Sequence, residues 1–295
     1  PVDSNTVFVG DDSGIYRTTN AGACWDTVLR GYSIDKIIPH PSDAKTVYAG
    51  FHRLWVFPQL GVLKTTDAGA SWQLATSGIY PFPDYWVRAL AIDEAHPETL
   101  YCSTGGFEGF GLFRTTTGGA KWFSMYNGSF DPAGATSLKV DPGASTVYAA
   151  SSNEGWLYIS HDGGLTWQPS ALDSVRTYVS DILVDSIHHT ILASVGRGSI
   201  PLYRTTNGGQ SWVAGNNGLP SGGYGMAQDR FGNLFLCAGY SSALTLFISD
   251  NGSDWTLFPC VPDILGVRVT VDGSWIFVRD VHGGIYRKRA APLGE

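Results

Sequence analysis

Residues 18–25 read TTNAGACW, and this phrase decides the fold because it recurs along the chain. The later copies are TTDAGASW at 65–72, TTTGGAKW at 115–122, SHDGGLTW at 160–167, TTNGGQSW at 205–212 and a degenerate ISDNGSDW at 248–255. The tryptophans of successive copies lie 47, 50, 45, 45 and 43 positions apart. A period of about 40–50 residues is typical of propellers and repeat arrays. One structural unit is therefore repeated along the chain.

Each repeat unit contains patterns for four strands. A short apolar stretch precedes the phrase, as in GIYRT at 14–18, and another lies farther upstream, as in TVFVG at 6–10. Alternating stretches such as VRALAID at 87–93 come before these. Alternation over about 4–8 residues between turn-forming residues predicts half-buried strands. We name the four strands A, B, C and D in chain order, with the recurring phrase in the C–D turn.

Four-stranded units repeated in this way are the blades of a β-propeller. The sequence predicts an all-β, seven-bladed propeller of antiparallel blades, in which the first blade lacks its inner strand A and the last lacks its outer strand D. We expect residues 1–289 to form a single propeller domain and residues 290–295 a flexible tail. Unpaired backbone groups at an open edge are costly. We therefore expect a segment upstream of Pro1 to close the ring, the alternative being self-association through a strand from a neighbouring molecule.

The pattern [S/T]-x-[D/N]-x-G-x-x-W closely resembles the Asp-box, or BNR repeat, of sialidases and many other propellers. A polar side chain at its third position can accept hydrogen bonds from backbone N–H groups, and its Gly can adopt a positive φ. The third box carries Thr117 where others carry Asp67 or Asn20, and a reaction that needs a carboxylate would not survive such exchanges. We therefore expect a structural role for Asn20, Trp25, Asp67, Trp72, Thr117, Trp122, Asp162, Trp167, Asn207, Trp212, Asp250 and Trp255.

Composition excludes several classes of protein. The 295 residues are 43% hydrophobic and 15% charged, which excludes intrinsic disorder. A net charge of −7 argues against nucleic acid as a partner. No apolar stretch is long enough for a transmembrane helix. The seven histidines show no metal-ligand spacing, so we expect neither a metal nor another cofactor.

Ligands of propellers usually meet the face that bears the D–A and B–C loops, and those loops are rich in aromatic and charged residues here. Aromatic rings beside Arg and Asp suit sugars, carboxylates or peptide segments. The candidate ligand-binding residues are Arg53, Trp55, Tyr85, Trp86, Arg88, Arg176, Tyr178, Asp181, Tyr224 and Arg268.

The resemblance implies three kinds of function. Sialidases hold their substrate with an Arg in an R-I-P motif, which this sequence lacks. Xyloglucan-type endoglucanases place carboxylates on two facing propellers, whereas the photosystem II assembly factor is a single seven-bladed propeller that binds protein. We expect a non-catalytic, extracytoplasmic binding or structural propeller that recognises a protein or glycan. The alternatives are a glycoside hydrolase using Asp35, Asp84 or Asp181, and a surface or filament subunit that self-assembles.

Overall fold

The computed structural model describes residues 5–53, 59–79, 86–105, 110–125, 134–151, 156–172, 178–196, 199–240, 243–259, 264–269, 275–280 and 284–289. The chain forms two compact units. The first contains residues 1–147 and 160–167, and the second contains residues 148–159 and 168–295.

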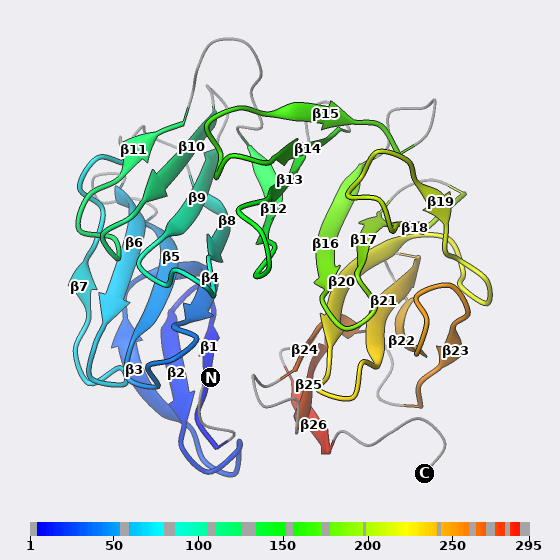
Figure 1. The fold of residues 1–295 in the computed structure, drawn as a ribbon. Helices are drawn as coiled ribbons and strands as arrows, with labels where there is room; N and C mark the ends of the chain where they lie inside the picture. The colour runs from blue at the N-terminus through cyan, green and yellow to red at the C-terminus, as the bar shows by residue number, and fades with distance from the viewer. Residues whose placement is uncertain are drawn as a thin grey trace. The chain divides into compact units, whose positions relative to one another are not determined.

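Seven sheets follow one another along the chain (Figure 1). The first three contain β1 (Val7–Gly10), β2 (Gly14–Thr18) and β3 (Asp26–Arg30); β4 (Ser33–Pro39), β5 (Val47–Arg53), β6 (Gln59–Thr65) and β7 (Gln73–Leu74); and β8 (Trp86–Ile92), β9 (Leu100–Gly105), β10 (Phe110–Thr115) and β11 (Phe123–Ser124). The next two contain β12 (Ala135–Val140), β13 (Val147–Ser151), β14 (Leu157–Ser160) and β15 (Gln168–Ser170); and β16 (Val179–Asp185), β17 (Thr190–Val195), β18 (Leu202–Thr205) and β19 (Val213–Ala214). The last two contain β20 (Gly223–Gln228), β21 (Leu234–Tyr240), β22 (Ala243–Ser249) and β23 (Thr256–Leu257); and β24 (Ile264–Val269), β25 (Trp275–Asp280) and β26 (Ile285–Arg289).

This arrangement is the seven-bladed β-propeller fold, and the prediction of an all-β chain of antiparallel four-stranded blades is confirmed. Within each sheet, strands consecutive in the chain are neighbours. In the described part of the chain the first sheet has three strands, β1-β2-β3, and the last has three, β24-β25-β26. Their positions match the predicted B, C and D strands of the first blade and the A, B and C strands of the last. Among the same residues no helix is long and apolar enough to cross a membrane.

The apolar core lies between neighbouring sheets because the blade strands bury alternate or successive apolar side chains. In the first unit, the Trp122 side chain is 2% exposed and packs in a cluster with Tyr48 and Leu100. In the second unit, Trp255 packs with Leu192 and Leu234. Trp122 and Trp255 therefore each pack between their own blade and the blade before it.

Four of the outer strands are very short, which limits the backbone they offer to other chains. Strands β7, β11, β19 and β23 each contain two residues. Leu74 in β7 and Leu257 in β23 expose 57% and 61% of their surface. These edges stay accessible, but each is too short to pair over a long stretch.

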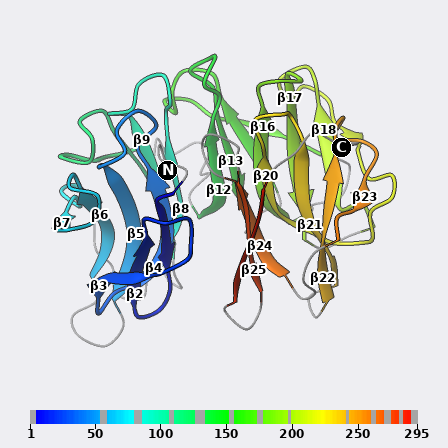
Figure 2. The ribbon, with the colours of Figure 1, turned by 90° about the horizontal axis from the view of Figure 1, so that it is seen from below.

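The inner strands of neighbouring blades lie side by side within each unit. In the first unit β8 contacts both β4 and β12, and in the second β20 contacts both β16 and β24 (Figures 1 and 2). The starts of these strands carry several of the predicted ligand-binding residues.

Candidate functional site

The inner strands carry β-bulges close to their first residues. The pairing with the second strand of the blade shifts between Ile34 and Lys36, Val87 and Ala89, Val179 and Asp181, Gly223 and Met226, and Ile264 and Gly266. A bulge inserts an extra residue, bends the strand and re-aims the local side chains. Arg88 and Tyr224, two predicted ligand-binding residues, are at such insertions. The sequence periodicity gave no sign of these bulges.

In the second unit, Tyr178 and Tyr224 lie against the same residue, Gly196. A Cβ atom on Gly196 would lie 3.4 Å from Cδ1 of Tyr178 and 3.3 Å from Cε1 of Tyr224. The Gly196 N–H donates to the Tyr178 carbonyl at 3.1 Å, and the Tyr224 hydroxyl donates to the Gly196 carbonyl at 3.2 Å. Tyr178 is 39% exposed and Tyr224 is half-buried. Two aromatic side chains from different blades are thus held beside one glycine.

Arg268 adds a positive charge beside this pair. It lies in β24, its side chain is exposed, and its Nη1 donates to the carbonyl of Val267 at 2.7 Å. A Cβ atom on Gly225, the neighbour of Tyr224, would lie 3.8 Å from the same Nη1. We call Tyr178, Gly196, Tyr224 and Arg268 the aromatic–arginine cluster.

Asp181 lies beside the cluster and holds two inner strands together. Its Oδ1 accepts a hydrogen bond from the N–H of Ile182 at 3.0 Å, and its Oδ2 accepts one from the N–H of Met226 at 3.0 Å. The Ser194 hydroxyl adds a second link by donating to the Tyr224 carbonyl at 2.5 Å. Both carboxylate oxygens of Asp181 therefore serve the backbone of β16 and β20.

The first unit brings together two further predicted residues. The Arg88 guanidinium lies over the Trp86 ring, 5.7 Å from the ring centroid, at the start of β8. Both side chains are half-buried. Trp55, Tyr85 and Arg176 lie outside the residues that the structure describes, as do residues 290–295 of the predicted tail. Arg53 ends β5, and its side chain also lies outside that description.

The recurring boxes share one pattern of local hydrogen bonds. In the second box, Oδ1 of Asp67 accepts the N–H of Ser71 at 2.8 Å, and the Thr65 hydroxyl accepts the N–H of Gly69 at 2.8 Å. The Gly at this position has a φ of 86°, which suits a residue without Cβ. Asn20, Thr117, Asp162 and Asn207 accept the corresponding N–H in their boxes. An amide, a hydroxyl and a carboxylate thus perform the same task.

The sixth box corrects the assignment of Asp250 to the acceptor position of the repeated pattern. Asn251, and not Asp250, is its acceptor: Oδ1 of Asn251 receives the N–H of Ser253 at 2.8 Å and of Asp254 at 2.9 Å. This copy has one residue fewer between its Ser and its Gly. The asparagine at position 251 therefore stands two residues after Ser249, as the acceptors of the other boxes stand after their Ser or Thr.

Hydrogen bonds lower the pKa of the two box aspartates with the most donors. The Ser71 hydroxyl and N–H, with the Thr65 hydroxyl, lower the pKa of Asp67 to about 2. Desolvation opposes the shift at Asp162, but hydrogen bonds from the hydroxyl and N–H of Thr166 outweigh it and lower that pKa to about 2. Both carboxylates are therefore ionised acceptors at neutral pH.

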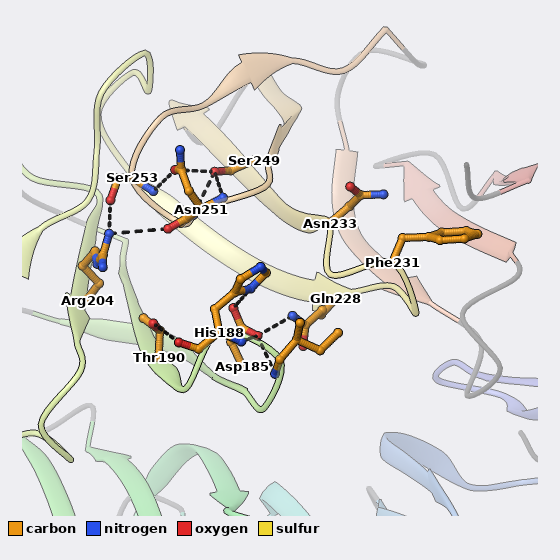
Figure 3. Close-up of polar contacts among 12 residues, drawn as sticks. Asp185, His188, Thr190, Arg204, Gln228, Phe231, Asn233, Ser249, Asn251 and Ser253 are labelled. Atoms are coloured by element: carbon orange, nitrogen blue, oxygen red, sulfur yellow. Dashed lines mark hydrogen bonds and ion pairs between the residues drawn. The ribbon is translucent and has the colours of Figure 1, made fainter. Parts of the chain in front are cut away.

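Three boxes accept a hydrogen bond from a basic side chain on the C strand of the blade before them. Nη1 of Arg17 donates to the Ala68 carbonyl at 2.7 Å, and Nζ of Lys64 donates to the Gly118 carbonyl at 3.1 Å. In the second unit, Nη1 of Arg204 reaches the Asn251 carbonyl at 3.4 Å and the Ser253 hydroxyl (Figure 3). We call this contact the latch. The sequence signal for it, a basic residue just before the Ser or Thr of the box, was missed.

The A–B turns provide another link between blades. Asp185 is 1% exposed by its side chain, and its Oδ2 lies 2.6 Å from Nδ1 of His188 (Figure 3). Its Oδ1 accepts a hydrogen bond from Nε2 of Gln228, in the next blade, at 2.6 Å. These partners fully engage a buried carboxylate, as its burial requires. Among the residues described, no group of three or more His, Cys, Asp or Glu side chains is placed to hold a metal ion.

Comparison with known proteins agrees with this geometry. The BNR/Asp-box repeat family matches residues 158–169, which contain the fourth box. The chain is a β-propeller that contains a BNR/Asp-box repeat. No curated protein matches its sequence.

Solved structures share the fold of this Asp-box propeller at low sequence identity. The extracellular domain of the putative one component system BT4673 from B. thetaiotaomicron has a TM-score of 0.71 and 15% identity, over 99% of this chain and 38% of that one. YCF48 bound to D1 peptide has a TM-score of 0.62 and 14% identity, over 97% and 81%. YCF48 from Cyanidioschyzon merolae has a TM-score of 0.58 and 14% identity, over 87% and 82%. At these identities the likeness shows the fold alone.

Proposed function

We propose that this Asp-box propeller is an extracytoplasmic binding protein that recognises a peptide segment of a partner protein through the aromatic–arginine cluster. The observation that carries the proposal is that Tyr178 and Tyr224 both lie against Gly196, with Arg268 close to Gly225. Aromatic rings give large contact areas, and an exposed guanidinium can hold a carboxylate or a backbone carbonyl. Tyr and Arg are also the residue types that most often dominate the energy of protein interfaces.

The bonding of Asp181 favours binding over hydrolysis. A glycoside hydrolase needs two carboxyl groups free to act as acid and as base or nucleophile. Both oxygens of Asp181 accept backbone N–H groups, which suits a structural carboxylate. Of the other two carboxylates considered, Asp35 is at a bulge in β4 and Asp84 lies outside the described residues.

Two structural neighbours support a peptide as the ligand and an extracytoplasmic location. One neighbour is YCF48 bound to a peptide, and another is an extracellular domain. A glycan is the second candidate ligand, because tyrosine rings also stack on sugars. A glycoside hydrolase is the third candidate, and the same experiment separates all three.

The experiment screens the purified protein against a displayed library of random peptides, a glycan array and a set of chromogenic glycosides. We expect peptide binding that falls about tenfold or more in each of the variants Tyr224→Ala and Arg268→Ala. The matched control is Arg230→Ala, because Arg230 lies over the Phe231 ring at 4.7 Å, beyond the other end of β20. Binding of glycans alone, or hydrolysis of a glycoside, would overturn the proposal. So would peptide binding that Arg268→Ala leaves unchanged.

A further inference from the structure

A pocket of about 460 Å³ lies in the first unit, beside the A–B turn that follows β8. It is thus at the end of β8 opposite the bulged start of that strand. The A–B turn after β8, the strands β9 and β10, and the fourth box surround it. Its lining is mostly polar and contains Asp93, His96, Thr99, Tyr101, Arg114, Ser145, His161, Asp162 and Gly163. The aromatic–arginine cluster contributes none of these residues.

Arg114 occupies the position of a latch cation but makes no latch. It stands just before Thr115, as Arg17 stands before Thr18 and Arg204 before Thr205. The carbonyl that it would bind, on Gly163, already accepts the Tyr101 hydroxyl at 3.0 Å. The Arg114 guanidinium instead lies over the Tyr101 ring, 5.8 Å from the centroid. Among the described residues its guanidinium has no hydrogen-bond or ion-pair partner, and its buried Nε has none either.

The two carboxylates of the pocket are engaged elsewhere. Asp93 accepts the N–H groups of Ala95 and His96, and its Oδ2 lies 3.1 Å from Nδ1 of His96. Asp162 accepts the N–H and the hydroxyl of Thr166, at 2.8 and 2.6 Å. Neither lies within 4.0 Å of the Arg114 nitrogens. The N–H donors of the Arg114 guanidinium therefore have no acceptor among the described residues. The pocket in front of them has room for one.

Two features fit an anion in front of Arg114. Gly163 leaves space there, since a Cβ atom on it would lie 3.5 Å from Nη2 of Arg114 and 3.5 Å from the Tyr101 hydroxyl. The imidazole of His161 lines the same space, with its Nδ1 3.3 Å from the Thr146 hydroxyl. A planar guanidinium binds carboxylate and phosphate oxygens through two parallel N–H donors.

We propose that this pocket is a second ligand site, which binds a small oxyanion, carboxylate or phosphate, through Arg114. The site is independent of the aromatic–arginine cluster. The anion takes the place that a box carbonyl takes at Arg17, Lys64 and Arg204.

Calorimetric titration with inorganic phosphate and with succinate, at neutral pH and constant ionic strength, tests the proposal. We expect saturable binding of one anion per chain, and the stronger of the two probes identifies the group that the pocket prefers. Arg114→Gln should weaken this binding about tenfold or more, and Arg114→Lys should retain part of it. Failure of both anions to bind would overturn the proposal, as would binding that survives in Arg114→Gln.

A matched variant separates loss of the site from loss of folding. Arg17→Gln removes a cation at the same strand position in another blade, where the guanidinium is latched. We expect Arg17→Gln to lower the thermal midpoint while the anion affinity stays unchanged. Arg114→Gln should lower the midpoint less and remove the affinity. If Arg114→Gln fails to fold, His161→Ala provides the second test, with a severalfold loss of affinity expected and an unchanged affinity counting against the site.

Discussion

Nη1 of Arg17 donates a 2.7 Å hydrogen bond to the carbonyl of Ala68, a residue of the second box. The box is therefore more than a local turn, because its backbone is an acceptor for the preceding blade. The same contact recurs from Lys64 to Gly118 and from Arg204 to Asn251. The three boxes that receive such a cation are thus linked to the blade before them in two ways, through that hydrogen bond and through the packing of the box tryptophan.

The latch predicts that Arg17→Gln destabilises the protein. A hydrogen bond from a charged donor to a half-buried carbonyl contributes about 1–3 kcal/mol, so we expect the free energy of unfolding to fall by about that amount. Arg30→Gln is the control, since Arg30 is exposed and, among the described residues, its guanidinium makes only a 3.4 Å hydrogen bond to Thr27 in its own strand. Chemical denaturation measures both. Equal effects of the two variants would show that the latch contributes nothing of its own.

The sixth box predicts different effects for two adjacent side chains. Asn251→Ala removes the acceptor of two N–H groups, and we expect a loss of about 1–2 kcal/mol in unfolding free energy. Asp250→Ala should change stability by less than about 0.5 kcal/mol because its side chain is exposed. The comparison uses thermal unfolding of both variants. A larger loss for Asp250→Ala would restore the alignment that places the aspartate at the acceptor position.

The backbone of the second box predicts a stabilising substitution. Ala68 has a φ of 58°, a left-handed conformation that costs an L-residue about 1–2 kcal/mol and costs glycine nothing. Ala68→Gly loses part of this gain to chain entropy, so we expect a net stabilisation of about 0.5–1 kcal/mol. Ala70→Gly, two residues later and without a positive φ, should destabilise. Differential scanning calorimetry of the two variants decides the matter, and a destabilising Ala68→Gly would contradict the argument.

The box aspartates predict a loss of stability in acid. The pKa of Asp67 and of Asp162 is lowered to about 2 in the folded protein, below the value of about 3.9 expected for an unfolded chain. Their stabilising contribution is therefore complete above about pH 4 and disappears as the pH falls toward 2. The double variant Asp67→Asn, Asp162→Asn should lose less stability over this interval. Asn207 shows that an asparagine can make the corresponding bonds to Ser211. Parallel pH profiles of the two proteins would contradict the assignment.

The sequence predicted the fold well because every repeat contains the residues that its own turn requires. A glycine at a positive φ, a polar acceptor and a tryptophan recur at fixed spacing, and these requirements are local. The shortened sixth copy shows the limit of that reading, since a one-residue deletion moved the acceptor from position 250 to Asn251. The site was harder to predict for a different reason. The contacts of Tyr178, Tyr224 and Arg268 depend on three different blades, and their bulges leave no periodic trace. The latch was missed because it joins residues about fifty positions apart, such as Arg17 and Ala68.

The bulges at the starts of the inner strands have a consequence for how such a protein can diversify. Each bulge accommodates one extra residue near the start of the strand, with paired residues on both sides, so an extra residue there need not shift the pairing that follows. Arg88 and Tyr224, two of the proposed ligand-binding residues, lie at these bulges, within two residues of the start of their strands. The side chains at the starts of the inner strands can therefore change without altering the packed interior of the blades.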